Sequence, residues 1–140
     1  MDARVEPTHD EVPMIDHISI AVSDLSRATS FYETVLGAIG YQLLVVRGST
    51  VGFGKQYPEF WLNARPDMEP LPANNGAHIC LRVRSAELVD TFHAAAIANG
   101  GTSNGAPGLR PHERLKGYYA AFIRDPDGNR IEAVTFVPPA

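Results

Sequence analysis

The stretch HISIAV, at residues 17–22, returns 61 positions later as HICLRV, at residues 78–83. In the same frame Phe31 is matched by Phe92, and a glycine follows shortly after each of them. Each copy is typical of a strand, then a helix, then a glycine that ends the helix. A shared histidine, strand phase and core phenylalanine in one frame are hard to attribute to chance, so the sequence predicts two similar modules.

Both strand copies alternate between apolar and other side chains. In the first copy Ile18, Ile20 and Val22 share one face, which we expect to pack against the helices. The opposite face of both copies carries small and polar side chains, and the two histidines, His17 and His78, begin it. This second face is typical of the wall of a cavity.

Helix caps and turn residues indicate where the other elements lie. Ser23-Asp24 and Ser85 each precede an apolar stripe with helical spacing, so two helices are predicted. The shorter strands are predicted at residues 41–47, 49–54 and 59–64, then at 102–104, 117–124 and 130–136. The remaining segments are predicted as a flexible N-terminal segment (1–13), a proline-rich linker (65–76) and a long loop (105–116). We therefore expect an α+β fold in which two βαβββ modules, 14–64 and 77–137, form a single domain.

Size and composition exclude several classes of function. The chain has 140 residues, 44% of them apolar, and a net charge of −4. An acidic chain without a basic run does not neutralise a phosphate backbone, so no nucleic-acid partner is expected. No apolar run approaches the roughly 20 residues that a bilayer demands, so no membrane partner is expected either. The single cysteine, Cys80, cannot form an internal disulfide, which is typical of a cytoplasmic protein.

One acidic residue stands where a strand should be apolar. The stretch RIEAV, residues 130–134, places Glu132 in the middle of a strand that follows the turn sequence DPDGN, residues 125–129. A buried carboxylate is costly unless it is paired or binds a cation. Taken alone, Glu132 and each histidine have an alternative structural interpretation. Together, His17, His78 and Glu132 form a 2-His-1-carboxylate set, which holds a divalent metal and leaves other positions open.

Other side chains are candidates for chemistry beside such a metal. The candidates for proton transfer are Tyr119, His112 and Glu59. The candidates for binding substrate are Arg82, Arg110 and Trp61. The arginines would clamp a carboxylate or phosphonate. The alternatives are ordinary ones: a strand aromatic for Tyr119, a solvated loop residue for His112, and a strand end that reaches water for Arg82.

The chain resembles the vicinal oxygen chelate superfamily, which includes glyoxalase I, bleomycin- and fosfomycin-resistance proteins, methylmalonyl-CoA epimerase and extradiol dioxygenases. The residues that carry the resemblance are 15–24, Phe31-Tyr32, 77–79 and 125–132. The resemblance implies paired βαβββ modules whose sheets curl into a cup, with the helices on its outer face and metal ligands at His17, His78 and Glu132. Glyoxalase I-like members have a fourth ligand, a glutamate, at a position that aligns with about Trp61. Three ligands resemble the fosfomycin-resistance and dioxygenase arrangement more closely.

The resemblance implies a metal-dependent enzyme that acts on a small molecule. A divalent cation (Zn, Mn, Fe, Ni or Co) would serve as Lewis acid on a substrate bound through vicinal oxygens, in an isomerase, lyase, thiol transferase or dioxygenase reaction. The alternative is a metal-free protein that sequesters a drug or metabolite, as the bleomycin-resistance branch does without a His/His/Glu set. We also expect a homodimer, because in some relatives the modules pair across chains and share the metal site.

Overall fold

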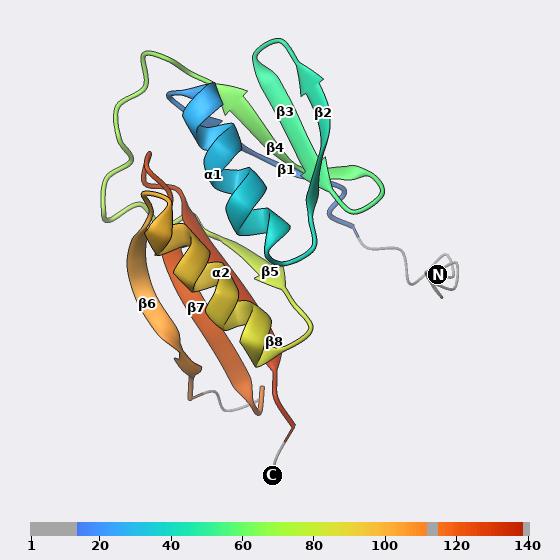
Figure 1. Ribbon diagram of the computed structural model, residues 1–140. Coiled ribbons are helices and arrows are strands. Elements are labelled where there is room, and N and C mark those ends of the chain that lie inside the picture. The colour runs from blue at the N-terminus through green and yellow to red at the C-terminus, as the bar shows by residue number, and fades with distance from the viewer. Residues whose placement is uncertain (1–13, 112–114, 139–140) are drawn as a thin grey trace.

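Two consecutive βαβββ modules make up the molecule (Figure 1). The structure is a computed structural model and describes residues 14–111 and 115–138. The first module consists of β1 (Ile18–Val22), α1 (Leu25–Gly37), β2 (Gln42–Arg47), β3 (Thr50–Gly54) and β4 (Pro58–Ala64). The second consists of β5 (Ile79–Arg82), α2 (Ala86–Ala98), β6 (Thr102–Leu109), β7 (Tyr118–Arg124) and β8 (Arg130–Phe136). The predicted α+β class with two βαβββ modules is confirmed, and the predicted flexible segment 1–13 lies outside the described residues.

Each module has its own four-stranded mixed sheet. The strand order is β1-β4-β3-β2 in the first sheet and β5-β8-β7-β6 in the second. The first strand of each module pairs parallel with the last, and the other pairs are antiparallel. Within the described ranges no hydrogen-bonded strand pair joins the two sheets. The modules therefore meet through their helices, loops and side chains.

The helices begin at capped residues and bury one face. The Asp24 carboxylate accepts a hydrogen bond from the backbone N–H of Arg27 at the start of α1. The Ser85 hydroxyl accepts one from the backbone N–H of Leu88 at the start of α2. Each helix packs against its own sheet, and the two helices contact each other (Figure 1). Among the residues described, neither helix is long and apolar enough to cross a bilayer. The core that they cover includes the fully buried Val22, Tyr32, Leu36, Phe53, Phe60, Leu62, Phe92, Ile123 and Ile131.

The DPDGN turn between β7 and β8 ties the second module to the first. Asp127 accepts hydrogen bonds from the backbone N–H and the hydroxyl of Ser23, at 3.0 and 2.6 Å. Asp125 is 4% exposed and accepts from the buried Tyr32 hydroxyl at 2.7 Å. The Asn129 amide donates to a β1 carbonyl group at 2.9 Å. We call Ser23, Tyr32, Asp125, Asp127 and Asn129 the inter-module clamp, a role that the sequence analysis, which interprets the motif as a turn, does not anticipate.

The prediction of a loop at residues 105–116 is wrong for its first part. Residues 105–109 belong to β6, although their sequence, GAPGL, is typical of a loop. The pairing of β6 with β7 contains two register shifts. Because β6 is an edge strand, such bulges accommodate the glycines and Pro107, whose missing N–H would interrupt an inner strand.

Candidate metal centre

Glu132 is a buried carboxylate in the middle of β8, with 2% of its surface exposed. The register pairs it with Cys80 of β5 on one side and Phe122 of β7 on the other. Its Oε1 atom lies 3.1 Å from Nε2 of His78. Its Oε2 atom accepts a hydrogen bond from the Tyr118 hydroxyl. This costly buried carboxylate is therefore paired with one of the two histidines within the single chain.

Two neighbours of Glu132, the Cys80 thiol and the Tyr118 phenol, keep their protons. Burial, followed by the Glu132 carboxylate, raises the pKa of the Cys80 thiol to about 12. Burial and the hydrogen bond to Glu132 also raise the pKa of Tyr118 above its ordinary value. At neutral pH the Glu132 side chain thus faces a neutral thiol and a neutral phenol.

His17 is oriented by a neighbouring acid. It precedes β1, and its Nδ1 atom lies 2.7 Å from Oδ2 of Asp16. The Tyr57 hydroxyl, on the turn between β3 and β4, donates to the same Asp16 carboxylate, at 2.5 Å from Oδ2. Hydrogen bonds from Tyr57 and then His17 lower the pKa of Asp16. A carboxylate that holds Nδ1 fixes the tautomer and leaves Nε2 available, as outer partners of metal-binding histidines do.

The two histidines share a cavity, but the three predicted ligands do not all meet. His17 and His78 both line a space of about 370 Å³ between β1, β4 and β5, together with Glu59 and Cys80. Among the residues that the structure describes, no three His, Cys, Asp or Glu side chains are close enough together to hold a metal ion. The structure thus places His78 beside Glu132, and His17 lines a cavity that His78 also lines. Coordination by all three stays a prediction.

The strand register identifies which residue stands at the position of the fourth ligand, the glutamate of glyoxalase I-like members. Ser19 pairs with Trp61 in the first module, as Cys80 pairs with Glu132 in the second. Trp61 therefore occupies in β4 the place that Glu132 occupies in β8, as the sequence analysis expects. Glu59 lies two residues earlier and accepts a hydrogen bond from the Tyr41 hydroxyl at 3.0 Å. Burial and Glu59 together raise the pKa of Tyr41 to about 12.

Tyr119, a predicted candidate for proton transfer, lies on the face of β7 opposite Glu132. Its hydroxyl donates to Asp90 of α2 at 2.6 Å, so the side chain lies on the helix face of β7. Its neighbour Tyr118 faces Glu132 instead. A strand reverses its faces when its phase shifts by one residue, and two adjacent tyrosines leave that phase ambiguous in the sequence. The other base candidate of the second module, His112, lies outside the described residues.

Both predicted substrate-binding arginines lie on the Glu132 face of the second sheet. The Arg82 guanidinium lies 4.7 Å from the ring centroid of Phe136, and that of Arg110 lies 5.5 Å from the ring centroid of Phe122. Arg130, which was not predicted as a site residue, lines a smaller cavity of about 160 Å³ beside His78. The signal was available, because Arg130 stands two residues before Glu132 and a strand returns to the same face every second residue.

Comparisons with known proteins agree with this fold. A family model described as the Glyoxalase/Bleomycin resistance protein/Dioxygenase superfamily matches residues 14–133. The structure of a glyoxalase/bleomycin resistance protein from Albidiferax ferrireducens is 34% identical, covers 87% of this chain and 98% of its own, and has a TM-score of 0.74. No curated protein sequence matches the chain.

Two further structures resemble the chain in fold alone. One is a glyoxalase/bleomycin resistance protein/dioxygenase family enzyme from Burkholderia phytofirmans, with 20% identity over 88% of this chain and 98% of its own, and a TM-score of 0.63. The other is a mutant of the fosfomycin resistance protein FosX from Listeria monocytogenes, complexed with Mn(II) and 1S,2S-dihydroxypropylphosphonic acid. It has 19% identity over 90% of this chain and 92% of its own, and a TM-score of 0.66. The family match over most of the chain and the 34% identical structure show that this chain belongs to the glyoxalase/bleomycin resistance protein/dioxygenase superfamily.

Proposed function

We propose that the protein is a metal-dependent enzyme in which His17, His78 and Glu132 hold a divalent cation. The observation that supports this most is the buried Glu132 carboxylate, whose Oε1 lies 3.1 Å from Nε2 of His78. Two imidazoles and one carboxylate are a donor set for Zn, Mn, Fe, Ni or Co. Such a cation supplies Lewis acidity to a small substrate bound through vicinal oxygens, in an isomerase, lyase, thiol transferase or dioxygenase reaction. The FosX structure, with its Mn(II) and dihydroxy phosphonate, is consistent with this proposal.

The side chains around the donors have positioning and binding roles in this proposal. Asp16 holds Nδ1 of His17, and Tyr118 holds Oε2 of Glu132, so each donor keeps one orientation. Arg82 and Arg110 bind a negatively charged group of the substrate from the Glu132 face of the second sheet. Glu59 is the remaining candidate for moving a proton, because it lines the same cavity as both histidines.

Metal content tests this proposal directly. After incubation with Mn, Fe, Co, Ni or Zn and removal of excess metal, we expect the wild-type chain to retain about one ion per site, measured by mass spectrometry. His17→Gln, His78→Gln and Glu132→Gln should each lower the affinity for metal by at least about tenfold, since each removes a ligand. Glu33→Gln, an exposed change on α1, is the matched control and should retain the metal.

A wild-type protein that binds none of these metals would contradict the enzyme proposal. The metal-free binding of a drug or metabolite, as in the bleomycin-resistance branch, would then be the better interpretation. A loss of metal in the Glu33→Gln control as large as in the ligand variants would show that the affinity does not depend on the three donors.

We further propose a homodimer in which the metal site takes His17 from one protomer and His78 and Glu132 from its partner. The support is geometric: His78 and Glu132 meet within one chain, whereas His17 does not join them in a group of three within the described residues. A second copy would supply the missing donor while its own His78 and Glu132 receive the first copy's His17, as two-fold symmetry requires.

Mixing two defective variants distinguishes a shared site from a site within one chain. His17→Ala and Glu132→Ala should each bind metal poorly. When they are unfolded and refolded together, half of the dimers should be mixed, and each mixed dimer should contain one intact site. We expect metal content to recover to about a quarter of the wild-type value. No recovery, or a monomer at micromolar concentration in sedimentation velocity, would contradict the shared site.

A further inference from the structure

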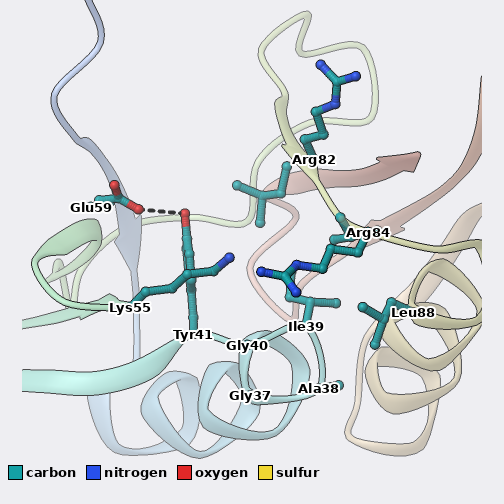
Figure 2. A pocket seen from close by; sticks show the side chains of 12 residues that line it. Gly37, Ala38, Ile39, Gly40, Tyr41, Lys55, Glu59, Arg82, Arg84 and Leu88 are labelled. Carbon is teal, nitrogen blue, oxygen red and sulfur yellow. Dashed lines mark hydrogen bonds between the residues drawn. The ribbon is translucent and has the colours of Figure 1, made fainter. Parts of the chain in front are cut away.

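A cavity that none of His17, His78 and Glu132 lines lies at one end of the contact between the modules. It has a volume of about 660 Å³ and is bounded by the end of α1, the turn between β3 and β4, the end of β5 and the start of α2 (Figure 2). Its size is within the range of small-molecule sites. The predicted roles of Glu59 and Arg82, which line it, concern the metal centre and assign no ligand to this cavity.

Two cations face each other across this cavity. Lys55 comes from the β3–β4 turn of the first module and Arg84 from the segment between β5 and α2 of the second, and Figure 2 shows their charged ends pointing toward each other. Among the described residues neither has a hydrogen bond or an ion pair. The lining carboxylate, Glu59, is engaged by the Tyr41 hydroxyl. Arg82 points away from the cavity, toward the Phe136 ring.

The internal repeat shows what occupies the corresponding place at the other end of the module contact. The shift of 61 positions that superimposes the two strand copies places Arg84 on Ser23. Ser23 binds the Asp127 carboxylate of the β7–β8 turn through its backbone N–H and hydroxyl, and Arg27 Nη2 lies 3.7 Å from that carboxylate. At that end a carboxylate of the chain closes the gap between a turn and a helix start. At the Arg84 end, the corresponding turn offers Lys55.

We propose that the cavity between Lys55 and Arg84 binds a small organic anion, whose phosphate or carboxylate group takes the place that Asp127 occupies at the other end. Two unpaired cations repel each other, and an anion between them turns that repulsion into two charge-assisted hydrogen bonds. The half-buried side chains of Ile39, Leu81 and Leu88 provide apolar contact for the body of the ligand. None of the three proposed metal ligands lines this cavity, although Tyr41, Glu59 and Leu81 line both it and the cavity that His17 and His78 share.

Isothermal titration calorimetry with phenyl phosphate and 3-phenylpropionate tests the site on the full-length protein. EDTA is present in all titrations, so that neither probe binds through a metal ion. We expect at least one probe to bind with a dissociation constant below about 1 mM, and phenol, which lacks the charge, to bind no more than weakly. The stronger probe identifies whether phosphate or carboxylate is the preferred group.

Matched variants connect the binding to the two cations. Lys55→Gln and Arg84→Gln should each weaken binding about tenfold, since each removes one charge-assisted contact. Arg65→Gln, an exposed arginine outside the cavity, should leave binding within about twofold. Lys55→Arg and Arg84→Lys keep the charge and should retain most of the affinity, which separates the effect of charge from misfolding. Binding of neither probe up to about 10 mM, or equal binding by the Lys55→Gln/Arg84→Gln double variant, would overturn the proposal.

Discussion

Replacing Asp125 with alanine should lower the free energy of unfolding by about 3–5 kcal/mol, which corresponds to roughly 10 °C in melting temperature. The Asp125 carboxylate accepts hydrogen bonds from the Tyr32 hydroxyl, the Asn129 side chain and the backbone N–H groups of Asp127 and Asn129. Burial raises its pKa, and these hydrogen bonds oppose that increase. Without the carboxylate, several buried donors lose their partner, and the first module loses part of its attachment to the second.

Thermal or urea unfolding, followed by circular dichroism, measures this effect. Asp90→Ala is the matched control, because Asp90 also accepts a hydrogen bond from a tyrosine, Tyr119, but on an exposed face. We expect the control to change the free energy of unfolding by less than about 1 kcal/mol. Equal losses in the two variants would show that the inter-module clamp does not contribute more than a surface contact.

Replacing Gly54 with alanine should destabilise the fold and also disturb His17. An added Cβ atom would lie 1.9 Å from the Tyr57 carbonyl oxygen, so the backbone of the β3–β4 turn must move. We expect a loss of about 2–3 kcal/mol, as in overpacked cores. Because Tyr57 on this turn donates to Asp16, and Asp16 holds Nδ1 of His17, the movement should also release the orientation of the histidine.

Two measurements separate these effects. Thermal unfolding gives the stability, and a long-range proton–nitrogen NMR spectrum gives the tautomer of His17, which we expect to be protonated at Nδ1 in the wild type and mixed in Gly54→Ala. Gly37→Ala is the control, because an added Cβ there meets nothing within 4 Å. An alanine at that helical position should be neutral or stabilising by up to about 1 kcal/mol. An unchanged His17 tautomer in Gly54→Ala would contradict the proposed chain of contacts.

The sequence predicted the features that depend on local periodicity. Ile18 and Ile20 pack against the core while His17 and His78 line a cavity, because alternation along a strand assigns its faces once one face is apolar. The family resemblance, not alternation, placed Trp61 at the fourth ligand position, and the register that pairs Trp61 with Ser19 agrees with it. The face on which Tyr119 lies could not be predicted, because β7 carries two adjacent tyrosines and a shift of one residue reverses the face of each.

Features that join distant segments could not be predicted in this way. The bonds of Asp127 to Ser23 and of Asp125 to Tyr32 depend on how the modules pack, which no local pattern encodes. The same applies to the distance of His17 from Glu132, because alternation places a side chain on a face but does not place one module relative to the other. The cavity between Lys55 and Arg84 is likewise lined by both modules, so no local pattern predicts it.

The inter-module clamp also has a consequence for biosynthesis. Tyr32 and its partner Asp125 are 93 residues apart, so a ribosome that adds about 5–20 residues per second synthesises the tyrosine roughly 5–20 seconds before the carboxylate. During this interval the nascent first module has a core hydroxyl group with no acceptor from the second. A chaperone that binds the emerging polypeptide should therefore dissociate late, after the DPDGN segment has left the exit tunnel.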